Sequence, residues 1–278
     1  MTTIEVHAFT DVGLCRDRNE DAILVGGWLS RTHTGTLTSI RVEVTAPTLC
    51  AVADGMGGHA GGHLASNLAL NILSTLGGTC SASDEIGAAL AYVNDQIRGV
   101  GADPELHGLG TTIAGLSITA TAIIAFNVGD SRIYSIDGGF LEQISVDDSV
   151  HDQYGRTSNL ITQSLGQPTP VDPHIIELPL KAGSYLICSD GVSAVMPAAG
   201  LRAAVLNADL AVCAAAVIES TRENGATDNF SFLLVEVADV PELAAPAEEV
   251  AAVQESVDRS VENLDSRSPV LEEFDVQH

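Results

Sequence analysis

The sequence predicts an α/β fold of the α+β type, with two mainly antiparallel sheets and helices on their outer faces. Short apolar runs joined by tight turns follow one another across residues 111–144, which is typical of an antiparallel meander rather than of a βαβ dinucleotide-binding fold. Two stretches with helical spacing of apolar residues, 64–97 and 198–223, come after predicted strands. Because a helix buries its apolar face against a neighbouring layer, we expect one helical pair on the outside of each sheet.

The N-terminal part of the chain carries strand patterns. Residues 4–10 alternate weakly between apolar and polar, and short apolar runs follow at residues 23–25 and 40–45. The polar stretch between these two runs is expected to be a hairpin connection. Residues 49–53 are apolar throughout, which predicts a strand buried on both faces.

Helices and strands alternate in the rest of the chain. Leucine and isoleucine recur at helical spacing over residues 64–76, and Gly77 and Gly78 provide a stop. A second helix is expected over residues 83–97, with its apolar residues on one side. The remaining predicted elements are strands at 174–178, 184–188 and 230–237, and alanine-rich helices at 198–206 and 209–223.

The composition excludes several classes of partner and site. The formal net charge is −25 with only 12 Lys and Arg residues, so we expect no nucleic-acid and no membrane partner, because both bind clustered basic residues. No apolar stretch approaches the ~20 residues that span a bilayer and no signal sequence opens the chain, so we expect a soluble cytoplasmic protein. Five cysteines without Cys-x-x-Cys spacing disfavour a disulfide framework or a zinc site.

The composition also divides the chain into two parts. Residues 1–238 contain no Pro/Ser-rich linker and are long enough to form the core of one domain. Residues 239–278 hold eleven acidic residues against two arginines, so we expect an acidic, disordered tail. Valines at helical spacing within residues 250–264 leave open an amphipathic helix that forms on a partner.

Aspartates stand at the ends of four apolar runs. Asp54, Asp130 and Asp190 each follow such a run, and Asp228 precedes the closing strand. One Asp-Gly turn has no special meaning, because both are ordinary turn residues. Several carboxylates at strand ends would repel one another unless a cation joined them, and all-oxygen ligation favours magnesium or manganese over zinc. The recurrence therefore predicts a hard-metal centre, where Gly55 leaves main-chain groups open to a ligand.

Seven motifs occur in order along residues 5–238. They are TDVGLCRDRNEDA (10–22), VADGMGGHAGG (52–62), GLGTT (108–112), VGDSRIY (128–134), LITQSLG (160–166), CSDGV (188–192) and TDNFSFLLVEV (227–237). This series resembles the metal-dependent protein phosphatases, the type 2C serine/threonine class, and their bacterial form in particular. The resemblance implies a four-layer αββα sandwich with the metal site at the sheet ends.

The resemblance implies metal-binding roles for several of these residues. Asp54 would bridge two metal ions, and the carbonyl oxygen of Gly55 would bind one of them. Glu20, through bound water, and Asp21 would support one ion.

Further roles follow from the same resemblance. Asp190 and Asp228 would hold the second ion, and Asp130 with Asp190 a third, so the implied cofactors are two or three Mn²⁺ or Mg²⁺. Arg16 would bind the substrate phosphate, and His59 would donate a proton to the leaving group. The implied reaction is hydrolysis of phosphoserine and phosphothreonine in proteins by a metal-bridging hydroxide. We expect a monomer whose partners are phosphoprotein substrates, among them a serine/threonine kinase or its targets.

The sequence departs from the family pattern in two places. His63 stands where an acidic residue is usual, and its i, i+4 spacing from His59 is one that zinc can use, although the glutamate of the metalloprotease motif is absent. The flap, a loop subdomain beside the active site, is short at about residues 147–160, and Asp148 replaces a histidine. We expect these changes to affect substrate selection and a third-metal site more than the two-metal chemistry.

Another class of function stays open at this point. A metal-loaded fold could act as a non-catalytic phosphoprotein-binding or scaffold module, with its acidic tail as a docking arm. Without the resemblance, Arg16, Glu20 and Asp21 would be interpreted as a solvated turn with local ion pairs. All the expected metal carboxylates are present, whereas an inactive copy typically loses one or more, and this favours the enzyme.

Overall fold

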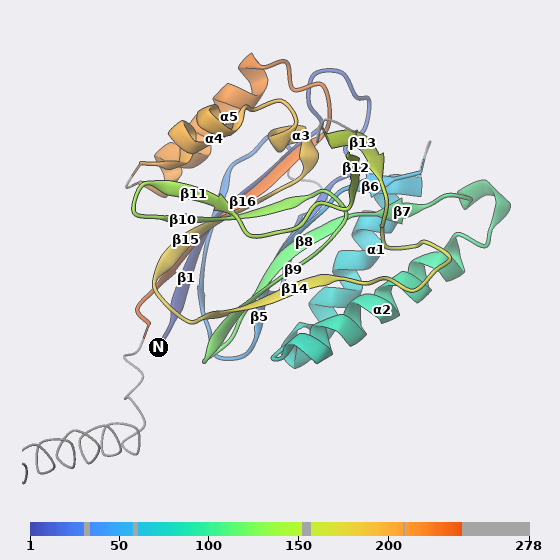
Figure 1. Ribbon diagram of the computed structural model, residues 1–278, viewed down its shortest axis with the longest axis horizontal. Helices are drawn as coiled ribbons and strands as arrows, with labels where there is room; N and C mark the ends of the chain where they lie inside the picture. The colour runs from blue at the N-terminus through green and yellow to red at the C-terminus, as the bar shows by residue number, and fades with distance from the viewer. Residues whose placement is uncertain (31–33, 58–60, 152–156, 208, 241–278) are drawn as a thin grey trace, which may run out of the picture. The chain divides into compact units, whose positions relative to one another are not determined.

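The computed structural model describes residues 1–30, 34–57, 61–151, 157–207 and 209–240. His59 and residues 241–278 lie outside the described residues, so the predictions made for them stay predictions. Two six-stranded antiparallel sheets lie face to face in the described part of the chain (Figure 1).

The first sheet brings the two ends of residues 1–240 together. Its strands, in spatial order, are β11 (Phe140–Gln143), β10 (Arg132–Asp137), β15 (Gly183–Cys188), β16 (Phe230–Ala238), β1 (Thr3–Asp11) and β4 (Thr38–Glu43). β1 pairs with β16 along its whole length, from Thr3 opposite Ala238 to Asp11 opposite Phe230. The loops after β1 and before β16 therefore lie at the same end of the sheet.

The second sheet contains the predicted meander. Its spatial order is β14 (His174–Pro179), β9 (Ala122–Val128), β8 (Ile113–Ile118), β5 (Thr48–Ala53), β2 (Ala22–Val25) and β3 (Trp28–Ser30). Every pairing in both sheets is antiparallel, which confirms the prediction of two antiparallel sheets.

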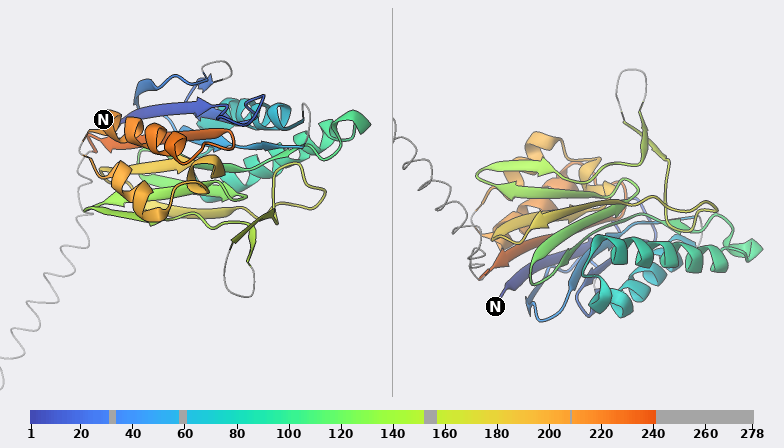
Figure 2. Two further views of the ribbon diagram at one scale, coloured as in Figure 1. Left: turned by 90° about the horizontal axis from the view of Figure 1, so that it is seen from above. Right: turned by 60° about the horizontal axis from the view of Figure 1, so that its bottom comes forward.

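Helices cover the outer face of each sheet. α1 (Gly61–Leu76) and α2 (Ser83–Val100) pack on the second sheet, and α4 (Ala198–Val205) and α5 (Leu210–Glu223) pack on the first. Figures 1 and 2 show the two helical pairs on opposite sides of the sheets, which is the expected four-layer αββα sandwich. Asp209 caps α5, because its side chain accepts hydrogen bonds from the N–H groups of Ala211 and Val212.

Three apolar clusters fill the spaces between the four layers, and single strands contribute to two of them at once. In β5, Leu49 and Ala51 face the cluster under α1 and α2, whereas Cys50 and Val52 face the cluster between the sheets. Successive side chains of a strand point to opposite faces. A strand in the middle of a four-layer sandwich must therefore be apolar at every position, which explains the uninterrupted run at residues 49–53.

Smaller elements complete the described chain. They are β6 (Gly55–Met56) paired with β7 (Gly110–Thr111), β12 (Ser149–His151) paired with β13 (Thr157–Ile161), the short helix α3 (Asp190–Ser193), and 3₁₀ turns at Gly77–Thr79 and Pro104–Leu106. The sequence analysis identified none of the two-stranded pairs, because each is too short to show a period.

Two further observations concern the chain as a whole. No helix among the described residues is long and apolar enough to cross a membrane. All five cysteines are free, and all except Cys15 are buried.

Candidate active site

Asp54 is fixed at the end of β5 by two threonines of the GLGTT motif. The N–H of Asp54 donates to Thr112 Oγ1 at 3.2 Å. Its carbonyl oxygen accepts from Thr112 N at 2.9 Å and from Thr111 Oγ1 at 2.8 Å. The main chain of Asp54 is thus held from both sides, so the rigid strand sets the position of its carboxylate.

The glycines after Asp54 allow the turn to approach α1 closely. A Cβ atom on Gly55 would collide with the carbonyl group of Gly62. A Cβ atom on Gly62 would lie 2.7 Å from the Gly55 backbone and 2.9 Å from Glu20 Cδ. Glycine is required at both positions, because any side chain would push apart the turn, the start of α1 and Glu20.

The aspartates predicted from the strand ends do come together. Burial raises the pKa of Asp54 well above its ordinary value, and the negative charges of Asp21, Asp190 and Asp228 raise it further. Burial also raises the pKa of Asp190, whose carboxylate lies beside that of Asp54. Buried carboxylates this close together repel one another, and a metal cation would relieve that repulsion.

Asp21 lies behind this cluster, at 5% exposure. Its Oδ2 accepts from Ser189 Oγ at 2.9 Å, whereas its Oδ1 is buried without a hydrogen-bond partner. Burial is the main reason that the pKa of Asp21 rises to about 7. A buried carboxylate oxygen without a donor is costly, and its presence beside other acids is typical of a cation-binding site.

Arg16 contacts one of the predicted metal ligands directly. Its Nη2 lies 2.6 Å from Asp228 Oδ2, and its side chain remains 53% exposed. The pairing also raises the pKa of Arg16, so the guanidinium stays charged. Arg16 therefore presents a permanent positive charge to the acidic cluster.

Asn229 organises the loop that carries Arg16 and Glu20, a role that the sequence did not reveal. Its Oδ1 accepts from Glu20 N at 2.8 Å, and its Nδ2 donates to the carbonyl oxygens of Val12 and Arg18 at 2.9 Å each. The position of Asn229 directly after the predicted metal ligand Asp228 could have indicated this role. The asparagine side chain has both donor and acceptor groups, so it can hold a neighbouring loop in place.

These residues line one open cleft of about 660 Å³ at the sheet ends. Its lining includes the predicted residues Arg16, Glu20, Asp54, Gly55, Asp190 and Asp228, and also Cys15, Asp17, Arg18, Met56, Gly57, Ile161 and Asn229. The lining combines five acidic residues, Asp17, Glu20, Asp54, Asp190 and Asp228, with the basic Arg16 and Arg18, and Ile161 from β13 is an apolar member. Such a cleft can attract a cation to its acids and an anion to its arginines.

Two other predicted residues, Asp130 and His63, are not among those that line this cleft. Burial and the charge of Asp190 raise the pKa of Asp130 to about 6, which places Asp130 near Asp190 although it does not line the cleft. His63 is exposed on α1, where its Nδ1 lies 3.1 Å from Asn67 Nδ2. Within the described ranges, no three His, Cys, Asp or Glu side chains form a ready-made metal cage.

The fold and the cleft define a class of protein, an αββα sandwich with an acidic centre at the sheet ends. The sequence profile of the protein phosphatase 2C family matches residues 37–231, and the chain belongs to this family.

Similar proteins include bacterial serine/threonine phosphatases. The chain is 30% identical over 250 residues to PstP of Mycobacterium tuberculosis, a match that spans 84% of this chain and 45% of PstP. It is 28% identical to PhpP of Streptococcus pneumoniae, spanning 84% of this chain and 97% of PhpP. The chain thus corresponds to less than half of the length of PstP.

Solved structures show the same relationship. The catalytic domain of PstP in complex with two manganese ions has 27% identity and a TM-score of 0.70, and the match covers 86% of this chain and all of that domain. A serine/threonine phosphatase of S. agalactiae has 26% identity and a TM-score of 0.71, covering 84% of this chain and 98% of that one.

Proposed function

We propose that this protein hydrolyses phosphoserine and phosphothreonine in proteins, with Mn²⁺ or Mg²⁺ as its cofactor. The observation that carries the proposal is the set of desolvated carboxylates of Asp21, Asp54 and Asp190. Their mutual repulsion is relieved by cations, and oxygen ligands suit these two metals. PstP and PhpP are named as protein phosphatases, and the PstP domain was solved with two manganese ions.

The residues around the cleft fit two hard cations. Asp54, the carbonyl oxygen of Gly55, Glu20, Asp190 and Asp228 would hold the ions. The lack of a three-residue cage among the described residues agrees with this arrangement, because Mg²⁺ and Mn²⁺ sites commonly retain several waters. The free Oδ1 of Asp21 is available to accept a hydrogen bond from such a water.

The chain's own residues would bind and orient the phosphate. When bound, the metal pair supplies a water of lowered pKa and neutralises charge on the phosphoryl oxygens. Arg16 can leave Asp228 and turn its planar guanidinium to the phosphate, because its side chain is half exposed. Asn229 would fix the loop of Arg16 in every turnover, since its side chain bonds main-chain atoms only.

Other roles are proposed on the motif match alone. His59 would donate a proton to the leaving group, and Asp130 with Asp190 would hold a third ion. We also propose residues 1–238 as the catalytic domain, with a short flap at about 147–160 and an accessory tail at 239–278.

The biological setting is likewise a proposal. We expect a monomer that acts in the cytoplasm on phosphoproteins, including a serine/threonine kinase or its targets, without a nucleic-acid or membrane partner. The net charge of −25 disfavours nucleic-acid and membrane partners, and five free cysteines suit a reducing compartment.

Hydrolysis of para-nitrophenyl phosphate and of a phosphothreonine peptide, with and without Mn²⁺, tests the proposal. We expect turnover with metal, its loss after chelation, and its loss in Asp54→Asn. Asp137→Asn is the matched control, because Asp137 is exposed at the end of β10 and pairs with Lys181 at the surface. Activity that survives thorough chelation contradicts the mechanism, and Mn²⁺ binding without turnover of either substrate supports the non-catalytic binding module.

A further inference from the structure

Three consecutive residues that lead into the flap are each held by a side chain from a different strand. The amide group of Asn127 in β9 donates to Val146 O at 2.6 Å and accepts from Val146 N at 3.3 Å. Arg132 in β10 binds Asp147 with Nη2 at 2.7 Å and Nε at 3.0 Å. His174 in β14 places Nε2 at 2.9 Å from Asp148 Oδ1.

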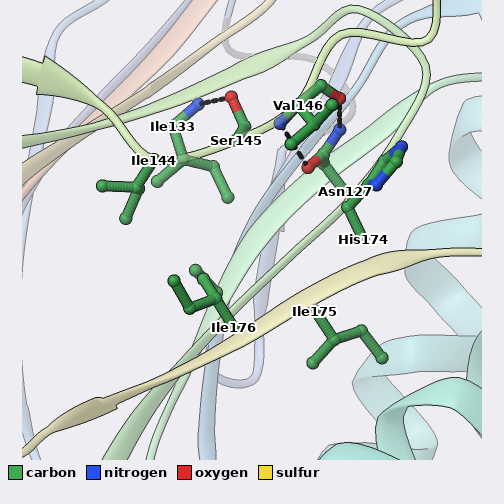
Figure 3. Close-up of a pocket in the computed structure, with 9 residues that line it drawn as sticks. Asn127, Ile133, Ile144, Ser145, Val146, His174, Ile175 and Ile176 are labelled. Atoms are coloured by element: carbon green, nitrogen blue, oxygen red, sulfur yellow. Dashed lines mark hydrogen bonds between the residues drawn. The ribbon is translucent and has the colours of Figure 1, made fainter.

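Figure 3 shows the side chains of His174 and Asn127 beside Val146, above the isoleucines of β14. They line a pocket of about 220 Å³ at the edge of the two sheets. The polar contacts gather at the end of this pocket that lies toward Val146, so the start of the flap is fastened to β9 and β14 in the second sheet.

Asp148 also fastens the far end of the flap. Its Oδ2 accepts from Gly129 N at 2.9 Å and from Gln163 Nε2 at 3.0 Å. Its main chain donates to Gly129 O at 3.0 Å and accepts from Thr162 N at 2.8 Å. The carboxylate of Asp148, near the start of the flap, therefore connects His174 in β14, Gln163 after the flap, and the turn that precedes Asp130.

Polar contacts hold both ends of the flap. Among the residues of β12 and β13 whose side chains the structure describes, which are Ser149, Val150, Leu160 and Ile161, none belongs to the three apolar clusters. A two-stranded hairpin alone is only marginally stable in water. Ile161, at the end of β13, nevertheless lines the acidic cleft, so a shift of the hairpin changes the cleft wall.

We propose that Asp148, Gln163 and His174 form a flap clamp, a set of positioning residues that places β13 against a phosphoprotein bound in the cleft. The inference rests on the proposed phosphatase function and assigns the affinity for extended substrates to this clamp. A small aryl phosphate occupies only the acidic centre, so the clamp does not affect its binding. A phosphopeptide extends past Ile161, so its affinity depends on the clamp.

Steady-state kinetics of clamp variants test the inference. Asp148→Asn keeps the size and shape of the side chain but replaces a carboxylate oxygen by an NH₂ group, which cannot accept hydrogen bonds from the partners of Asp148. His174→Leu removes the ring nitrogen that contacts Asp148 Oδ1. For both we expect KM for a phosphothreonine peptide to rise about fivefold to tenfold, the effect of losing roughly one hydrogen bond. We expect kcat/KM for para-nitrophenyl phosphate to change less than about twofold. His174→Gln, which retains an N–H donor of similar reach, should restore the peptide KM.

Glu177→Gln is the matched control, because Glu177 is exposed on the same strand β14 as His174. Two results would overturn the inference. One is an unchanged KM for the peptide in Asp148→Asn, and the other is an equal fall in kcat/KM for the peptide and for para-nitrophenyl phosphate. Failure of the phosphatase proposal is recognised separately, since the wild type would then hydrolyse neither substrate.

Hydrogen exchange tests the placement of the flap without turnover. Amides of residues 149–151 and 157–161 should exchange faster in Asp148→Asn than in the wild type, whereas amides of β5 should not change. Equal exchange of the flap amides in both proteins contradicts the clamp.

Discussion

Replacing Asp21 by asparagine should stabilise the metal-free protein at neutral and alkaline pH. Burial raises the pKa of Asp21 from 3.8 to about 7. The folded metal-free protein therefore holds a proton here that the unfolded chain releases between about pH 4 and pH 7. Stability from this group is present below the unfolded pKa and is lost as pH rises through the folded pKa.

The size of the effect follows from the two pKa values. A tenfold change in proton affinity corresponds to about 1.36 kcal/mol, so the rise from 3.8 to about 7 corresponds to a loss of order 4 kcal/mol between about pH 4 and pH 8. An asparagine side chain carries no charge at any of these pH values and can still accept the hydrogen bond from Ser189. Asp21→Asn should therefore be more stable than the wild type at pH 8 by a few kcal/mol, and equal to it near pH 4.

Urea unfolding of metal-free protein between pH 5 and pH 8 measures this difference. The free energy of unfolding of the wild type should fall as pH rises. This fall should be smaller in Asp21→Asn and the same as in the wild type in the exposed control Asp137→Asn. Added Mn²⁺ should stabilise the wild type at pH 8 by binding the folded state, and Asp21→Asn less. Equal slopes in wild type and Asp21→Asn, or a less stable variant at pH 8, would refute the reasoning.

Three further outcomes are expected. Asp54→Asn, Asp190→Asn and Asp228→Asn should each reduce turnover below about a tenth of wild type while circular dichroism stays native, because each removes a charge that holds metal; a folded variant above that rate would remove the residue from the site. Arg16→Ala should raise KM more than it lowers kcat, and an unchanged KM would exclude it from phosphate binding. Deletion of residues 240–278 should leave aryl phosphate hydrolysis unchanged, because the tail is acidic and poor in large apolar residues; a several-fold rise in kcat/KM, or a melting temperature lower by more than a few degrees, would show that the tail is docked.

The sequence predicted those features that depend on local pattern. The apolar run at residues 49–53 indicated a buried strand, and the structure places its alternate side chains in two different clusters. The aspartates at strand ends predicted that Asp54, Asp130, Asp190 and Asp228 share one centre. The structure places three of them in one cleft, and Asp130 is not among its lining residues.

Contacts between distant residues could not be predicted in the same way. Asn229 bonds the main chain of Glu20 across 209 positions, and no spacing rule covers such a distance. The sequence shows Asp148 only as an acid where the family has histidine, whereas its bonds to Gly129, Gln163 and His174 depend on how three segments fold together. Polar side chains of this kind have many possible partners, and the complete fold selects among them.

The pairing of β1 with β16 has a consequence for how the protein is made. The first strand of the domain cannot complete its sheet until the last one has left the ribosome, a contact that spans over 200 positions. Asp228 comes just before β16 and Asp54 far earlier, so a nascent chain carries half of the acidic cleft long before the other half exists. The complete acidic cleft, which includes Asp228, therefore forms only after β16 has been synthesised.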